Sequence, residues 1–279
     1  MRLATSFLPS TNPIDETTDV AVVIDILRAT TVMSVAIANG AEEITTTCDV
    51  QTAREIANNL SPPPLLCGER SCVPIEGFDC GNSPAEYSPS RVAGRHLIVT
   101  TTNGTKAIQA ASLAKQVLLG SFVNQRAVAE SLDPDACVAL VCAGTDGFVT
   151  LEDVLFAGAL VSHFQSRLDQ RQLASLELND ESQIACEMWR SWFAPDAGES
   201  QARVSEPAGS TEAAGPSESA ELSTEHAAAL ASRLSQSRGG KNLIRAGYEA
   251  DLLRCAQVDS VSVVPRRIAI REGASVFGR

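Results

Sequence analysis

The clearest hydrophobic pattern in the chain is the uninterrupted apolar run Val20–Ile24, which is followed by Asp25 and by a small-residue apolar segment that ends at Gly40. A short run without alternation is typical of a strand that is covered on both faces, and the segment after it suits a helix crossing back over a sheet. In open α/β sheets, ligands bind beyond the carboxyl ends of the strands. This pattern therefore predicts a buried strand with a candidate site at Asp25.

The same alternation of apolar runs and helical spacings continues along the chain. Strands are predicted at residues 42–47, 65–67, 96–100, 116–120, 136–141, 261–264 and 268–270. Helices are predicted at residues 50–60, 106–112, 124–132, 180–193 and 248–255, and as a long apolar helix after Thr150. Strands that alternate with helices indicate an α/β fold. We expect one domain over residues 1–279, a three-layer α/β/α arrangement with a mostly parallel or mixed central sheet.

Residues 195–226 depart from this pattern, because they consist of Ala, Ser, Glu, Gly and Pro with almost no large apolar side chain. Such a composition buries too little apolar surface to offset the conformational entropy lost on ordering. We expect an acidic, disordered insertion within the domain. It carries seven acids against one base, Arg203, up to residue 225, so its net charge of −6 is half of the −12 of the whole chain.

Composition narrows the class of protein and its partners. A net charge of −12 disfavours nucleic-acid partners, whose phosphates require basic patches. No apolar segment approaches the ~20 residues of a membrane span or forms a signal-peptide core, so we expect a cytoplasmic protein with no membrane partner. The eight cysteines are scattered, several within apolar runs, which favours buried thiols over disulfides. The sequence leaves open whether the chain forms a homo-oligomer.

Polar residues gather after three of the predicted strands. Asp25 and Arg28 follow the first, residues 101–105 follow the strand at 96–100, and Glu152 with Asp153 opens the helix after the strand at 136–141. If these strands are parallel, their carboxyl ends meet at one edge of the sheet. Each turn also has a structural explanation: Asp25 as a helix cap with Arg28 as a surface ion-pair partner, and Thr150 with Asp153 as a capping pattern.

The turn after residue 100 has the chemistry of an anion site. Hydroxyls, an amide side chain and a glycine at a strand-to-helix turn supply donors and permit close backbone approach, which phosphate binding requires. The P-loop spacing is absent, so nucleoside triphosphate binding is not predicted. The turn consists of Thr101, Thr102, Asn103, Gly104 and Thr105.

A long turn-rich segment after residue 68 carries a second group of candidates, namely Glu69, Arg70, Glu76, Asp79 and Asn82. Long ordered loops are often functional, although polar side chains in such a loop can also satisfy its own backbone. Near the C-terminus, Arg238 precedes two glycines and is a further candidate for an anionic ligand. A turn at a helix start explains those glycines equally well.

Together these residues suggest phosphoryl transfer or hydrolysis assisted by Mg²⁺. Oxygen ligands suit this ion, and Asp25, Glu69, Asp79 and Asp153 are the candidate ligands. The expected catalytic residues are Asp25, Arg28, Glu69 and Asp79. The expected substrate-binding residues are Arg70, Asn82, Thr101, Thr102, Asn103, Gly104, Thr105 and Arg238. Two mechanisms remain open: attack by Asp25 on phosphorus, or attack by water. The second is preferred, because residues 26–28 lack the second Asp that aspartate-nucleophile phosphatases use as an acid.

Six motifs in order, IDILRATT, GER, GFDCGNSP, TTTNGTKA, CAG and LEDVLFAGA, resemble the 2-phosphosulfolactate phosphatase family, which is associated with coenzyme M biosynthesis. The resemblance covers residues 20–158 and resumes at 239–265, whereas the acidic insertion departs from the compact family pattern. It implies an α/β fold, Mg²⁺ dependence and hydrolysis of 2-phosphosulfolactate to sulfolactate and phosphate. Two alternatives remain: a phosphatase of another phosphohydroxy acid, and a non-catalytic binder of sulfonated or phosphorylated acids.

Overall fold

The structure is a computed structural model that describes residues 2–193 and 216–279. Its strands are β1 (Arg2–Ser6), β2 (Val20–Ile24), β3 (Glu43–Thr46), β4 (Leu65–Arg70), β5 (Val73–Pro74), β6 (His96–Thr100), β7 (Gln116–Gly120), β8 (Cys137–Cys142), β9 (Glu177–Leu178), β10 (Arg266–Arg271) and β11 (Ala274–Gly278). Its helices are α1 (Ala29–Ala38), α2 (Val50–Asn58), α3 (Pro89–Val92), α4 (Gly104–Ala110), α5 (Gln125–Ser131), α6 (Leu151–Ser166), α7 (Gln170–Ser175), α8 (Asp180–Phe193), α9 (Pro216–Gln236), α10 (Arg238–Arg245) and α11 (Glu249–Cys255).

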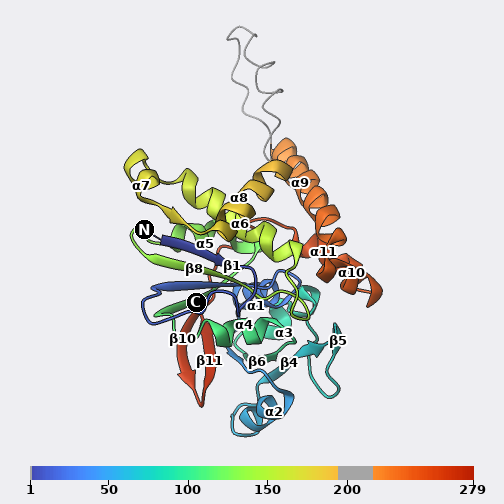
Figure 1. The fold of residues 1–279 in the computed structure, drawn as a ribbon. Coiled ribbons are helices and arrows are strands. Elements are labelled where there is room, and N and C mark those ends of the chain that lie inside the picture. Colours follow the sequence, from blue (N-terminus) through green and yellow to red (C-terminus); the bar gives the residue numbers. More distant parts are fainter. Residues whose placement is uncertain (1, 194–215) are drawn as a thin grey trace.

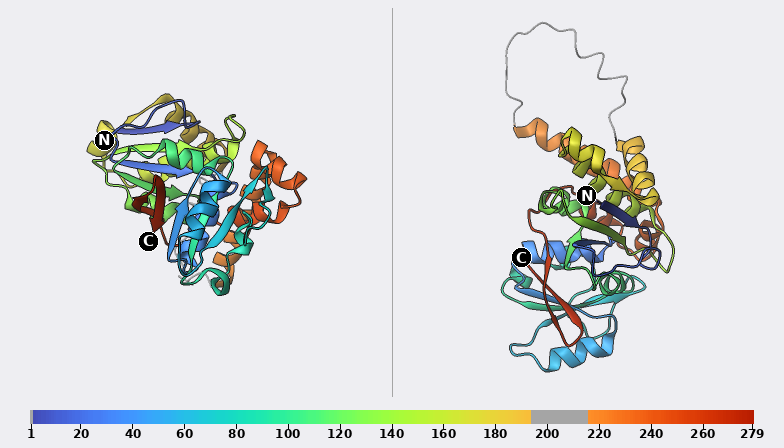
Figure 2. Two further views of the ribbon diagram at one scale, coloured as in Figure 1. Left: turned by 90° about the horizontal axis from the view of Figure 1, so that it is seen from below. Right: turned by 60° about the vertical axis from the view of Figure 1, so that its left-hand side comes forward.

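Within the described residues, the strands form one sheet in the order β5-β4-β6-β3-β11-β10-β7-β2-β8-β1-β9 (Figure 1). β2 is parallel to both neighbours, with Ile24 opposite Gly120 and Cys142. β3, β6 and β4 form a second parallel block. The antiparallel β10–β11 hairpin, red in Figure 2, joins the two blocks. The sheet is therefore mixed, and the prediction of a layered α/β fold is confirmed.

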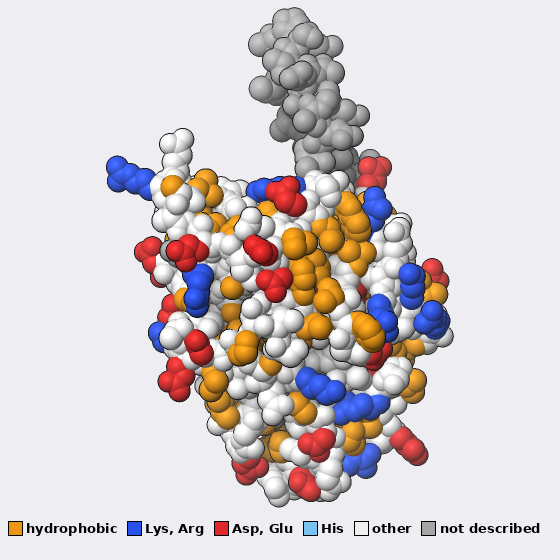
Figure 3. Space-filling view, in the orientation of Figure 1, with side chains coloured by type: hydrophobic (Ala, Val, Ile, Leu, Met, Phe, Trp, Pro, Cys, Tyr) orange, Lys and Arg blue, Asp and Glu red, His pale blue; other side chains and the backbone are white. Residues whose placement is uncertain are grey.

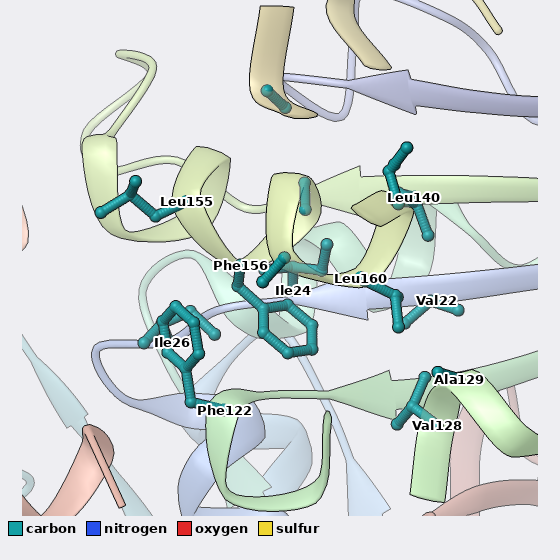
Figure 4. Close-up of a cluster of buried hydrophobic side chains, with 14 of the residues drawn as sticks. Val22, Ile24, Ile26, Phe122, Val128, Ala129, Leu140, Leu155, Phe156 and Leu160 are labelled. Atoms are coloured by element: carbon teal, nitrogen blue, oxygen red, sulfur yellow. The ribbon is translucent and has the colours of Figure 1, made fainter. Parts of the chain in front are cut away.

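Helices pack on both faces of β2, because its side chains alternate between two apolar clusters. On one face, Val22 and Ile24 pack with Phe156 of α6 and with Phe122, and the two rings meet edge to face at 5.2 Å between centroids (Figure 4). On the other face, Ala21 and Val23 pack with α1 and α4. All five β2 residues are buried, as the apolar run predicted. This burial on both sides gives the carboxyl end of β2, and thus Asp25, a rigid position.

The sheet corrects the expectation that three parallel strands bring their ends to one edge. That expectation holds for β2 and β8, which are adjacent and parallel. It is wrong for β6, because three successive antiparallel pairings, β7 with β10, β10 with β11 and β11 with β3, separate its block from β2. The turn after β6 nevertheless reaches Asp25, as the packing of Gly104 shows below.

The C-terminal strand pair also differs from the expected one. Residues 261–264 form no strand, and the hairpin instead pairs β10 with β11. Its turn lies at Glu272 and Gly273, which both have positive φ, 52° and 81°. The glycine there adopts this left-handed conformation without steric cost. Pro265 separates residues 261–264 from β10, which begins at Arg266.

The predicted disordered insertion at residues 195–226 falls largely outside the described residues, which omit 194–215. Its last part, from residue 216 onward, lies in helix α9, so that helix begins before the boundary expected at residue 226. No helix within the described ranges combines the length and apolar character needed to cross a membrane.

Candidate active site

Two adjoining cavities lie at the carboxyl end of β2. The inner cavity has a volume of about 40 Å³, and the outer one of about 420 Å³. Glu69, Asn103 and Asn242 line both, so the cavities form one site with a small inner part and a wider mouth. The complete inner lining is Asp25, Leu27, Arg28, Glu69, Cys72, Asn82, Asn103, Thr145, Gly239 and Asn242.

Asp25 lies at the centre of the inner cavity wall and is only 8% exposed. The Ala29 N–H donates to its Oδ1 at 3.1 Å, which fixes the carboxylate against the start of α1. Burial raises the pKa of the Asp25 carboxyl to about 7, with a further increase from the Glu69 and Glu152 carboxylates, while the Ala29 N–H and Arg28 oppose it. Asp25 therefore combines the helix-capping role with exposure to the cavity.

Gly104 explains how the turn after β6 reaches Asp25. A Cβ at this position would lie 2.7 Å from Asp25 Oδ2 and 2.6 Å from the Ala29 Cβ. Both distances are below van der Waals contact, so only glycine lets α4 begin this close to α1. The two parallel blocks thus meet at Asp25 although their strands do not share an edge.

Glu69 joins the turns that follow β4 and β6. It is 7% exposed, and its carboxylate accepts hydrogen bonds from the Thr102 N–H at 2.8 Å and from the Cys72 N–H at 2.7 Å. Because the same carboxylate lines both cavities, it faces any ligand that passes from the mouth to Asp25. β4 extends to Arg70, so Glu69 lies on a strand and not, as expected, in the loop.

Two acids at the start of α6 have separate roles. Asp153 accepts hydrogen bonds from the Ile26 N–H and the Gly144 N–H, each at 3.0 Å, so it ties together the segments after β2 and β8. Glu152 is 1% exposed, and its Oε2 has no hydrogen-bond partner among the described residues. Burial raises the pKa of both carboxyls.

Gly239 connects Glu152 with the cavity. It lines the inner cavity, and a Cβ there would lie only 2.0 Å from Glu152 Oε1. The Glu152 carboxylate therefore occupies the space that a side chain at 239 would fill. The sequence placed Glu152 beside Asp153 at the same strand end, and of the two acids only Glu152 keeps an oxygen without a partner among the described residues, so it is the better candidate for chemistry.

Arg28 is held in the inner cavity wall by residues that the sequence did not single out. Its Nη1 lies 2.6 Å from Asp251 Oδ2, and both side chains are almost fully buried. The guanidinium also stacks over the Tyr248 ring at 4.3 Å from the centroid. The Ser83 hydroxyl donates to the other Asp251 oxygen at 2.7 Å. Asp251 and Tyr248 could not be recognised from the sequence, since each resembles an ordinary residue at a helix start.

Asn82 lines the inner cavity and has unused hydrogen-bonding capacity. It is 6% exposed, and its Oδ1 has no partner within the described part of the chain. A buried polar atom of this kind costs free energy unless a ligand or water satisfies it. Asn82 is therefore placed to bind a ligand atom.

The hydroxyl turn after β6 divides between structure and site. Thr101 Oγ1 accepts from the Thr105 N–H at 3.3 Å, and the Thr105 hydroxyl donates to the Thr101 carbonyl at 2.9 Å, so these two residues stabilise the start of α4. Thr102 lines the outer cavity, and Asn103 lines both cavities. Two of the five residues of the predicted anion site thus line the cavities.

Asp79 and Arg70 are among the predicted site residues that line neither cavity. Asp79 is exposed, and its carboxylate accepts from the Leu66 N–H at 2.8 Å near the beginning of β4, remote from the end that carries Glu69. Arg70 follows Glu69 on the strand and so points to the opposite face. It donates to the Cys48 carbonyl at 3.1 Å and to the Thr100 hydroxyl at 2.9 Å. Both side chains have structural roles here.

The expected four-acid metal site is not assembled in this form. Among the described residues, no three His, Cys, Asp or Glu side chains are arranged to hold a metal ion. Asp79 and Asp153 are engaged elsewhere, which leaves Asp25 and Glu69 in the inner cavity. These two carboxylates with the unpartnered Asn82 Oδ1 still fit Mg²⁺, which usually binds through one or two carboxylates plus substrate phosphate and water.

The chain is an α/β protein with its cavity at strand ends, and the proteins it is similar to identify it as an enzyme of the phosphoric monoester hydrolase class. A family model described as 2-phosphosulpholactate phosphatase matches residues 7–206. The chain therefore belongs to the 2-phosphosulpholactate phosphatase family, which the resemblance of its motifs predicted.

Individual relatives agree with this assignment over nearly the whole chain. The probable 2-phosphosulfolactate phosphatase of Symbiobacterium thermophilum is 36% identical over 248 residues, 88% of this chain and 90% of that protein. Proteins of the same name from Thermosynechococcus vestitus and Prochlorococcus marinus are 32% and 34% identical, each over 96% of this chain and 97% of the relative. The similarity thus extends beyond the family-model match, through α10 and α11.

Proposed function

We propose that this chain hydrolyses 2-phosphosulfolactate to sulfolactate and phosphate with the help of Mg²⁺. The observation that carries the proposal is the inner cavity, where Asp25 and Glu69 face the same small space as Arg28 and Asn82. The names of the relatives supply the substrate. The inner cavity is small and polar, so we assign the phosphoryl group to it and the rest of the substrate to the wider mouth.

The residues of the inner cavity suit a phosphoryl group. The Arg28 guanidinium, fixed by Asp251 and Tyr248, would neutralise charge on the phosphoryl oxygens. The unpartnered Asn82 Oδ1 is an acceptor, so it would face the cation and not a phosphoryl oxygen. Asp25 and Glu69 would hold Mg²⁺, which when bound would neutralise phosphate charge and orient the ester.

We prefer attack by water over attack by Asp25. An aspartyl-phosphate route needs a second acid in the same turn, and residues 26–28 are Ile, Leu and Arg. Hydrolysis breaks the bond between phosphorus and the ester oxygen, and the sulfolactate hydroxyl takes up a proton. Glu152 is our candidate proton donor: it lies against Gly239 of the inner cavity wall, burial raises its pKa, and its Oε2 has no partner among the described residues.

Phosphate release from a panel of phosphoesters tests the proposal. We expect the highest kcat/KM for 2-phosphosulfolactate, lower values for other 2-phosphohydroxy acids, and loss of activity when a chelator removes Mg²⁺. A folded protein that releases no phosphate from 2-phosphosulfolactate with Mg²⁺ would contradict it. Calorimetry then distinguishes the rival binding function, since a non-catalytic binder would hold sulfolactate tightly without metal or turnover.

A further inference from the structure

One face of α10 carries three basic side chains at helical spacing, Arg238, Lys241 and Arg245, with Asn242 beside them. Residues three and four apart lie on the same side of a helix. The opposite side, Gly239, Gly240 and Leu243, is buried. A shallow cavity of about 330 Å³ is lined by the four polar residues. We refer to Arg238, Lys241 and Arg245 as the α10 basic row.

The α10 basic row opens onto the candidate active site. Arg245 and Asn242 also line the outer cavity, and Asn242 lines the inner cavity too. Gly239, on the buried side of the same helix, touches Glu152 closely. The helix therefore places Arg245 at the mouth of the site, with Arg238 and Lys241 in the adjoining shallow cavity.

These cations are poorly neutralised by the protein. The nearest carboxylate to Arg238 is Asp146 at 3.9 Å, and both side chains are about half exposed. Neither Lys241 nor Arg245 has an ion pair within the described residues, and Arg245 contacts only the Asn242 amide oxygen, at 3.5 Å. The α10 basic row is thus a locally positive surface in a chain whose net charge is −12. Basic side chains gather over α10 at the right of Figure 3.

Arg28 and Arg70, the other arginines near the site, are not available to bind an anionic group at the mouth of the site. Arg28 is committed to Asp251 and to the inner cavity, and Arg70 donates to backbone and Thr100 on the opposite face of β4. Arg238 is held in place by stacking over Phe148, at 4.1 Å from the ring centroid. The mouth of the site therefore obtains its positive charge from α10.

We propose that the α10 basic row binds a second, strongly anionic group of the substrate, the sulfonate, and so selects short phosphoesters that carry such a group. The inference rests on the proposed function, because it assigns the phosphoryl end to the inner cavity. The row is exposed to solvent, so its effect is electrostatic and weakens as salt is added.

The test compares two substrates that differ only in the sulfonate, 2-phosphosulfolactate and 2-phospholactate, using the variants Lys241→Gln, Arg245→Gln and the double variant. A charged hydrogen bond contributes about 1.5–3 kcal/mol, so we expect kcat/KM for the sulfonated ester to fall by about 10-fold per removed cation. We expect kcat/KM for 2-phospholactate to stay within about 2-fold of wild type, as usual for a change among exposed charges. Arg171→Gln on α7, at the far side of Figure 1 from α10, removes one exposed cation as the matched control.

If the Lys241 and Arg245 variants lost kcat/KM equally on both substrates, or lost none on either, the inference would be overturned. Its failure is distinct from failure of the proposed function, which shows as absence of phosphate release by the wild-type protein. In that event, calorimetry measures the binding of sulfolactate to the wild-type protein, Arg245→Gln and Arg171→Gln. An affinity that falls about 10-fold in Arg245→Gln and is unchanged in Arg171→Gln supports sulfonate binding by the α10 basic row. Equal affinity in all three proteins overturns it.

Discussion

The Arg28 guanidinium and the Asp251 carboxylate form a buried ion pair, 2.6 Å between Nη1 and Oδ2, across 223 residues of sequence. Asp251 belongs to α11, whereas Arg28 begins the crossover helix after β2. The Ser83 hydroxyl bonds to the same carboxylate, so three distant segments meet at one acid. The cationic wall of the inner cavity therefore depends on the C-terminal part of the chain.

Asp251→Asn should destabilise the protein, because it leaves the buried Arg28 charge without its partner. Breaking a buried pair in this way costs about 3–5 kcal/mol, which urea denaturation can measure. We also expect a lower kcat/KM from the less constrained guanidinium. Glu249→Gln, an exposed acid in the first turn of the same helix, is the control and should leave both quantities close to wild type. Equal stability of the two variants would show that the pair contributes little.

Asp25→Asn should abolish most activity and preserve the fold, because an asparagine oxygen can still accept from the Ala29 N–H. We expect kcat to fall by about 100-fold or more, the scale of losing a catalytic group. Asp79→Asn is the matched control, since the sequence suggested both acids but the structure places Asp79 outside the cavities. If Asp79→Asn were as inactive as Asp25→Asn, the assignment of a catalytic role to Asp25 and a structural role to Asp79 would be wrong.

Gly239→Ala should impair catalysis, because its Cβ would lie 2.0 Å from Glu152 Oε1 and displace that carboxylate. The expected result is a lower kcat with a folded protein, measured by phosphate release and circular dichroism. Shortening the acid in the double variant Gly239→Ala/Glu152→Asp makes room and should recover part of the lost kcat. Wild-type kcat in Gly239→Ala alone would remove Glu152 from the mechanism.

The metal-free protein should lose stability as pH rises through about 7. Burial raises the pKa of Asp25 to about 7 in the folded chain from its ordinary value of 3.8, so the folded state binds more protons than the unfolded state between these pH values. Its contribution is therefore fully present below pH 3.8 and is lost as the pH passes 7, on the order of a few kcal/mol. Thermal unfolding from pH 5 to 8 measures this slope.

Mg²⁺ should reverse that loss, since a bound cation balances the buried carboxylates and stabilises the folded state. We expect the increase in Tm on adding Mg²⁺ to be larger at pH 8 than at pH 5. Asp25→Asn is the control, and its Tm should depend less on both pH and Mg²⁺. If the Tm of the wild-type protein did not change with Mg²⁺ at any pH, this result would argue against a metal at Asp25.

The local features of this protein were predictable from its amino-acid sequence. The apolar run Val20–Ile24 predicted a strand buried on both faces, and β2 has those bounds. His96–Thr100 and Gln116–Gly120 were likewise predicted with their observed bounds, because hydrophobic periodicity records burial residue by residue. The motifs were also sufficient for the family.

Which side chains share the site depends on the packing of distant segments. Asp79 and Glu69 looked equivalent in the sequence, yet a hydrogen bond to Leu66 holds one away while the other lines the cavity. Glu152 and Asp153 are adjacent, and packing alone separates their roles. Asp251 and the α10 basic row reach the site from the end of the chain. Periodicity is a local property, whereas the partner of a polar side chain depends on how distant segments pack, and no spacing in the sequence encodes that.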